Sequence, residues 1–394
     1  MDSIETIICL MLLLMAIPDL CRKFGRPAFA NIFFVIFGIV LEPLVQPDVK
    51  TMVKEAGEVG FLLVLFEVGL EIELPKFREF VRPLRYALFW SLSQYFLIMA
   101  LAWVAGLNLS QGILAASALS SCSLSMAYFG WKHYPGLTGK SRNFVVQVMI
   151  ALEVMAIVVL SVGGVAVEHG FGWFILLKLA GIAVTVFLIS RFASHVVKLF
   201  QWIIQKTTQW RVHFLVLLVL IICAVGDRLG LSAAKTAFFL GLFMSRAEFQ
   251  GQSVEEYIAP VSRRFLIPIF FMSLGLVIDA RMLYSYLALL ALCGSFLLIG
   301  FREAIHRRWL KTGGDNGTYL LLCPNLTMAA LAAKTLLEAH SVMAATWVIL
   351  SGLFLSVISL SLLPRVVEEN NNNQPTPLPA PNPTSTPNPA LKTA

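Results

Sequence analysis

Apolar stretches long enough to cross a lipid bilayer recur along the whole of this sequence. A membrane-spanning helix needs about 20 predominantly apolar residues, and the chain carries about thirteen apolar stretches, of which 231–245 and 265–278 are short for a full crossing. The stretches lie near 3–20, 28–46, 57–74, 86–106, 109–130, 144–167, 171–190, 212–229, 231–245, 265–278, 282–301, 318–337 and 341–364. Backbone polar groups inside a bilayer must pair within the protein, so this repetition predicts an all-α polytopic membrane protein.

Composition excludes several classes of function. Hydrophobic residues make up 58% of the 394 residues and charged residues 13%, against about 25% charged in soluble domains, so one anchor on a soluble domain is excluded. The net charge of +7 falls in short loops rather than on a solvated basic face, which argues against nucleic acid. The six cysteines and six histidines lack metal-ligand spacing, and no phosphate-binding loop is present. We therefore expect no metal, no cofactor, no nucleotide and no enzyme activity.

The loop charges predict an orientation in the lipid bilayer. Most lysines and arginines fall in alternate loops, as expected for loops on the cytoplasmic side. The opposite loops hold only Lys50, Lys54, Arg228 and Arg281. The N-terminus is then outside and the C-terminus inside, in a plasma membrane such as a bacterial inner membrane. The last stretch, 368–394, is rich in Asn, Pro and Thr and predicts a disordered cytoplasmic tail after a membrane domain of residues 1–367.

Several segments resemble those of a known family in their order along the chain and in the side of the membrane on which they begin and end. They are GRPAFANIFFVIFGIVLEP at 25–43, GFLLVLFEVGLEIEL at 60–74, ALSSCSLS at 118–125, QVMIALEVMAIVVL at 147–160, LGLSAAKTAFFLGLFMSR at 229–246 and FLIPIFFMSLGLVID at 265–279. In this order the chain resembles the monovalent cation:proton antiporter superfamily, in the branch of Kef-type and sodium/proton exchangers. The resemblance implies inverted repeats near 1–167 and 212–364, a linker helix at 171–190, and a homodimer.

Two spans at corresponding positions of these repeats are interrupted by polar residues. The interruptions are Ser120, Ser121 and Ser123 in the first repeat, and Pro324, Asn325 and Thr327 in the second. A proline within a span frees backbone carbonyls, and paired interrupted helices point to a transport site near the middle of the bilayer. The alternative is that both interruptions are simple kinks.

Two glutamates lie near the middle of their spans, Glu153 and Glu67. A carboxylate there is costly unless it is paired, hydrated or protonated. The resemblance places Glu153 at the first position of an acidic pair, while Val154 replaces the aspartate that binds ions in relatives. Glu153 either takes over that role, serves as a structural charge partner, or stays protonated and silent.

Relatives also often carry a basic residue near the middle of the eleventh span, but 283–300 has none. Lys235 and Lys334 lie within other spans and are candidate ion-pair partners of Glu153 or Glu67. Lysine stems also reach the interface from such positions, which is the alternative interpretation.

We expect secondary exchange of a monovalent cation, Na⁺ or K⁺, for protons. A single carboxylate that swaps one proton for one cation moves no net charge, so exchange is expected to be electroneutral. The alternative is a protein of the same fold without cation exchange, acting as a sensor, a partner subunit or an organic-solute carrier.

Overall fold

Helices make up nearly all of the chain that this computed structural model describes, which is residues 3–71, 77–169, 180–181, 211–228, 233–245, 248–249, 252–308 and 315–364. Within these ranges the strands are β1 (Glu248–Phe249) and β2 (Gln252–Ser253), paired antiparallel. The predicted linker, apart from 180–181, and the predicted tail lie outside the described residues.

Five described stretches are long and apolar enough to cross a membrane. They are Val81–Val104, Gly139–Leu160, Tyr286–Arg308, Thr318–Glu338 and Val342–Leu362. The all-α membrane architecture predicted from the sequence is therefore confirmed.

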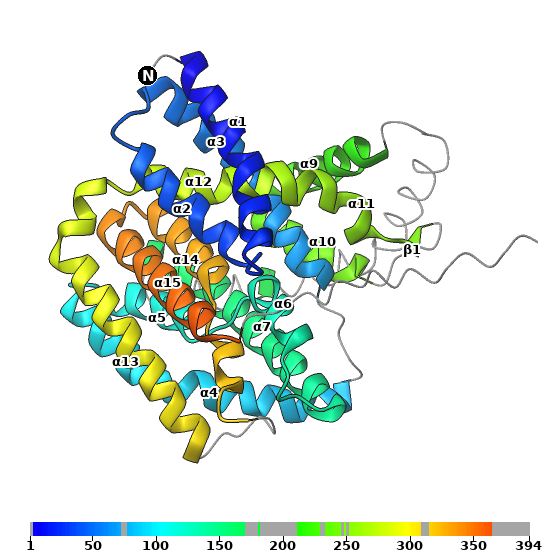
Figure 1. The fold of residues 1–394 in the computed structure, drawn as a ribbon, viewed down its shortest axis with the longest axis vertical. Helices are drawn as coiled ribbons and strands as arrows, with labels where there is room; N and C mark the ends of the chain where they lie inside the picture. Colours follow the sequence, from blue (N-terminus) through cyan, green and yellow to red (C-terminus); the bar gives the residue numbers. More distant parts are fainter. Residues whose placement is uncertain are drawn as a thin grey trace, which may run out of the picture.

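The first bundle occupies the upper part of Figure 1. It contains α1 (Ser3–Lys23), α2 (Phe29–Leu41), α3 (Pro47–Glu71), α9 (Arg211–Arg228), α10 (Ala233–Met244), α11 (Val254–Val261), the π-helix η1 (Ser262–Leu266) and α12 (Ile267–Val277). Its most extensive packing joins α3 to α10, α2 to α12 and α3 to α12. The short apolar run predicted at 265–278 is the second half of a helical segment that begins at Val254, because charged residues in η1 and α11 interrupt the apolar pattern.

Two pairs of glycines bring helices of the first bundle into backbone contact. A Cβ added to Gly38 of α2 would lie 2.3 Å from a carbonyl oxygen of α12, and Gly275 of α12 faces it. In the same way, a Cβ on Gly241 of α10 would lie 2.1 Å from a carbonyl oxygen of α3, beside Gly69. Small residues permit such close approach between membrane helices, so these four glycines set the spacing of the bundle.

The second bundle occupies the lower part of Figure 1. It contains α4 (Phe77–Val104), α5 (Leu109–Leu119), α6 (Leu124–His133), α7 (Gly139–His169), the 3₁₀-helices η2 (Ala280–Tyr284) and η3 (Thr318–Leu322), α13 (Tyr286–Arg308), α14 (Leu326–Glu338) and α15 (Val342–Leu362). The α14–α15 hairpin lies against α13 and α5, and α7 packs against α4, α5 and α14. Helix α13 continues past the apolar run predicted to end at 301, which carries Arg302 into the bundle rather than into a loop.

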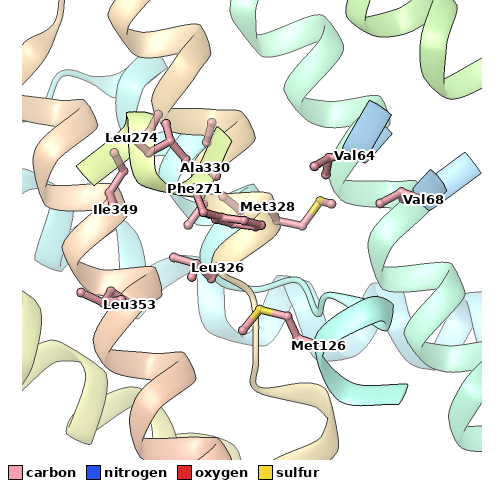
Figure 2. Packing of buried hydrophobic residues seen from close by; sticks show 14 of the residues in the cluster. Val64, Val68, Met126, Phe271, Leu274, Leu326, Met328, Ala330, Ile349 and Leu353 are labelled. Carbon is pink, nitrogen blue, oxygen red and sulfur yellow. The ribbon is translucent and has the colours of Figure 1, made fainter. Parts of the chain in front are cut away.

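The two bundles meet mainly through α2 with α15 and α3 with α6. Apolar side chains from both sides form one buried cluster there (Figure 2). The cluster includes Val64 and Val68 of α3 and Phe271 of α12, together with Met126 of α6 and Met328 of α14. The interface near the interrupted helices is thus apolar.

A candidate ion-binding site where two interrupted helices cross

Both predicted interruptions are breaks in helical structure, and they lie against one another. Residues 120–123 separate α5 from α6, and residues 323–325 separate η3 from α14. The backbone N–H of Ser123 donates to the carbonyl of Pro324 over 2.7 Å, which joins the two breaks directly. The interrupted spans predicted at 109–130 and 318–337 are thus each two helical pieces, and the residues of each break bond across to the other chain segment.

Side chains strengthen the crossing. The Ser123 hydroxyl donates to the Thr327 hydroxyl over 3.0 Å, and the Asn325 amide donates to the carbonyl of Leu119 over 2.9 Å. All of these side chains are buried. The carbonyls at the end of α5 have no partners within their own helix, so Asn325 supplies one from the opposite segment. The structure thus brings Ser123, Asn325 and Thr327 of the two predicted interruptions together.

Ser120 and Ser121 make local contacts at the same break. The Ser120 hydroxyl lies 2.7 Å from that of Ser91 on α4, and the Ser121 hydroxyl donates to the carbonyl of Ala118 over 2.6 Å. A second hydroxyl pair, Tyr95 with Ser117 at 2.8 Å, lies on the same two helices. These bonds fix α5 against α4 up to the point where the helix breaks.

A buried arginine holds the crossing from the side of α13. The guanidinium of Arg302 donates to the side-chain oxygen of Gln94 over 2.7 Å, to the carbonyl of Leu119, and to the carbonyl of Cys323 over 3.4 Å. Helix C-termini carry partial negative charge, so a cation is favourable where α5 and η3 both end. Sequence reasoning missed Arg302 because it directly follows the apolar run, and Gly300 with Phe301 gives no signal that the helix continues.

A cysteine lies in each break. The thiol of Cys122 donates to the carbonyl of Leu321 over 3.3 Å, and that of Cys323 to the carbonyl of Tyr319 over 3.3 Å. Both cysteines are fully buried, and neither forms a disulfide.

Glu153 lies on α7, the helix that packs against α5, α6 and α14 around the crossing. Its side chain is fully buried, and it lies within electrostatic range of the Cys122 thiol. The structure therefore brings the predicted carboxylate to the predicted pair of interrupted helices. Val154, the next residue, packs against the apolar core.

Glu67 lies in the other bundle, on α3. The Ser262 hydroxyl donates to one of its carboxylate oxygens, and Nε of Arg263 donates to the other over 3.0 Å. Both partners come from the π-helix η1, which packs against α3. Glu67 thus has an arginine and a hydroxyl on its own bundle, and the structure does not place it on the helices that form the crossing.

The two predicted lysines lie elsewhere. Lys334, near the end of α14, lies 3.9 Å from a carboxylate oxygen of Glu58 and 4.5 Å from the centre of the Phe61 ring. Its ion pair is thus with Glu58 rather than with Glu153 or Glu67, which corrects the predicted pairing. Lys235 lies in the first turn of α10, in the first bundle, where only its backbone is described. A single sequence does not reveal which helices are neighbours, and this is why the partners were missed.

Several known proteins are similar to this chain in sequence or in fold. A probable Na⁺/H⁺ antiporter of Methanocaldococcus jannaschii is 24% identical over 68% of this chain and 70% of its own length. An Na⁺/H⁺ antiporter of Enterococcus hirae is 23% identical over 69% of this chain and 73% of its own length. A K⁺ efflux antiporter of Arabidopsis thaliana is 23% identical over 71% of this chain and 50% of its own length.

The solved structure of the sodium proton antiporter MjNhaP1 of Methanocaldococcus jannaschii at pH 8 superposes with a TM-score of 0.66. The match covers 91% of this chain and 95% of that chain at 16% identity, which establishes the fold. The model of the transmembrane sodium/hydrogen exchanger family matches residues 9–361, nearly all of the membrane part. The chain therefore belongs to the sodium/hydrogen exchanger family.

Proposed function

We propose that this chain exchanges a monovalent cation, Na⁺ or K⁺, for protons, and that the carboxylate of Glu153 binds the two ions in turn. The observation that carries the proposal is one fully buried carboxylate beside the crossing of two broken helices, in a chain of the exchanger family. A buried carboxylate is costly as a bare charge, so it binds either a proton or a cation. The two ions then compete for one group.

The crossing supports this chemistry in two ways. Broken helices supply hydroxyl and carbonyl oxygens, which are the ligands that hard cations prefer. Arg302 offsets the negative ends of α5 and η3, so the carboxylate is left as the group whose charge changes. Exchange at one carboxylate is electroneutral, because the proton and the cation carry the same charge.

The proposal includes two inverted repeats, near 1–167 and 212–364. In support, the second helix of each half contacts the third helix of the other half, as α2 with α12 and α10 with α3. Each contact is made at a glycine pair, Gly38 with Gly275 and Gly241 with Gly69. The two helix breaks, at residues 120–123 and 323–325, likewise lie one in each half of the chain and contact each other.

The proposal also places the protein in a plasma membrane as a homodimer, with the N-terminus outside and the C-terminus in the cytoplasm. Support for the orientation comes from the basic residues of alternate loops. Support for a dimer comes from α1, which exposes Ile8, Leu12 and Met15 along one side, an apolar face suited to a second copy or to lipid.

Reconstitution into proteoliposomes tests the function. An imposed pH gradient should collapse when Na⁺, K⁺ or Li⁺ is added, and Glu153→Gln should abolish the response while Glu67→Gln retains it. Folded protein that responds to no cation would contradict the proposal and would favour a sensor, a partner subunit or an organic-solute carrier.

A further inference from the structure

The two bundles touch through an apolar face, but polar contacts at Arg26 and at Lys334, both among the described residues, also cross between them. Apolar packing is non-directional, so the cluster in Figure 2 does not by itself determine the position of one bundle relative to the other along their interface. Hydrogen bonds are directional and short-ranged, and a cation–π contact requires the cation to lie over the ring within about 6 Å of its centre. The polar contacts therefore determine the relative position of the bundles.

The first contact joins the loop between α1 and α2 to the end of α15. The Arg26 guanidinium donates to the carbonyl of Leu360 over 2.7 Å and to that of Ser361 over 3.1 Å. These carbonyls lie in the last turn of α15, where helical carbonyls lack partners and carry partial negative charge. Gly25, with φ of 66°, makes the left-handed turn that ends α1 and precedes Arg26.

The second contact joins α14 to α3. The Lys334 ammonium lies 4.5 Å from the centre of the Phe61 ring and 3.9 Å from the Glu58 carboxylate. Phe61 is itself buried in the first bundle, 5.3 Å from Phe270 between ring centres. The lysine of one bundle is thus seated on an aromatic ring of the other, with a carboxylate beside it.

The two contacts lie at opposite ends of the α14–α15 hairpin. Lys334 is one turn from the loop that joins the two helices, whereas Leu360 is in the last turn of α15. Helix α15 has 21 residues, so it is about 30 Å long and the contacts are separated by nearly that length. A slide or tilt of the second bundle by one helical turn, about 5.4 Å, would break both.

We propose that Arg26 and Lys334 are positioning residues of the transport cycle, which hold the bundle that carries Glu153 in the position described here. This inference rests on the proposed function, because exchange requires the site to face each side of the membrane in turn. Both contacts must then break and re-form in every cycle. Neither residue touches the transported ions; each acts through the position of the bundle.

Cross-linking provides the first test. In full-length protein with the accessible Cys9 and Cys293 replaced by serine, Arg26→Cys with Ser361→Cys is joined by a short cleavable bifunctional thiol reagent. We expect cation-dependent exchange to fall at least tenfold and to return when the cross-link is cleaved. The control pair, Gln111→Cys with Ser341→Cys, lies within the second bundle, where the native side chains are 2.8 Å apart, and its cross-link should leave exchange unchanged.

Spin-label distances provide a test that needs no transport, so failure of the proposed function is distinguishable from failure of this inference. Labels at Val40→Cys and Met343→Cys, both exposed and one on each bundle, should report two distances. The two distances correspond to two positions of the bundles. Arg26→Gln combined with Lys334→Gln should change the ratio of the two populations roughly tenfold, as expected for the loss of charge-assisted contacts. Arg26→Lys should restore part of the change.

Lys54→Gln is the matched control, since it removes an exposed charge from the helix that carries Glu58 and should leave the ratio unchanged. A single distance that no variant alters would overturn the proposal. So would a 26–361 cross-link that fails to form in folded protein, or one that forms without slowing exchange.

Discussion

The two bundles each bury a glutamate, and the surroundings of the two carboxylates differ. Glu67 of the first bundle receives a hydroxyl and an arginine from the same π-helix. Glu153 of the second bundle is buried beside two broken helices whose ends are already satisfied by Asn325 and Arg302. Glu67 is therefore held by groups of one neighbouring helix, whereas Glu153 lies beside unwound backbone, whose oxygens are suited to a cation. Both glutamates lie near the middle of their spans, so depth does not distinguish them. The groups that surround each carboxylate do.

The largest difference between the two acids should appear in transport. Glu153→Gln keeps the shape of the side chain but removes the titrating group, so exchange in proteoliposomes should fall by two orders of magnitude or more. Glu67→Gln should keep exchange within about threefold, because the loss of one partly exposed ion pair is a modest perturbation. Equal losses in both variants would end the distinction between the two carboxylates.

The crossing should depend on Arg302 more than on other arginines of α13. Arg302→Met removes three hydrogen bonds inside the membrane, each contributing about 1 kcal/mol, so the free energy of unfolding should fall by about 3 kcal/mol. Arg307→Met, which removes an exposed pair with Glu303, should change it by about 0.5 kcal/mol or less. Steric-trap unfolding measures both. Similar values for the two variants would show that the crossing does not need the guanidinium.

Glycine-to-alanine substitutions should lower stability in the tightly packed first bundle but not at an open position of the second. Gly241→Ala places a Cβ 2.1 Å from a backbone oxygen, and such overpacking should cost about 2 kcal/mol of stability. Gly300→Ala on α13 meets nothing within 4 Å and should be neutral or stabilising by up to about 1 kcal/mol. Thermal denaturation in detergent ranks the two; a stable Gly241→Ala protein would argue against a rigid first bundle.

The pair formed by Glu67 and Arg263 should contribute a small coupling energy. The Arg263 side chain is 45% exposed, so solvent screens the interaction and a double-mutant cycle of Glu67→Gln with Arg263→Gln should give about 1 kcal/mol or less. The cycle is measured on the free energy of unfolding. A zero coupling would leave Glu67 held by the Ser262 hydroxyl rather than by charge.

The smallest expected effect is that of membrane potential. One net charge moved per cycle would respond to 100 mV by about 2.3 kcal/mol, whereas one-for-one exchange at Glu153 should not respond at all. A potassium diffusion potential with valinomycin, applied while sodium exchange is recorded, measures this. A rate that follows the potential would mean that a second titrating group accompanies Glu153.

Much of the fold and part of the site could be predicted from the sequence. Apolar length predicted a helical membrane protein, and Pro324 and the serines near 120 lie where the structure breaks two of its helical segments. Arg302 was missed because a hydropathy window ends where charge begins, although the helix continues to Arg308. The partner of Lys334 was mispredicted, since pairing between α14 and α3 depends on tertiary packing that local patterns do not encode.

Cys122 and Cys323 place one thiol in each broken segment, shielded from solvent in the structure described here. Thiol reagents that enter only through water will reach them no faster than the crossing becomes wet. The rate at which these two thiols are modified during turnover therefore measures how often water reaches the crossing.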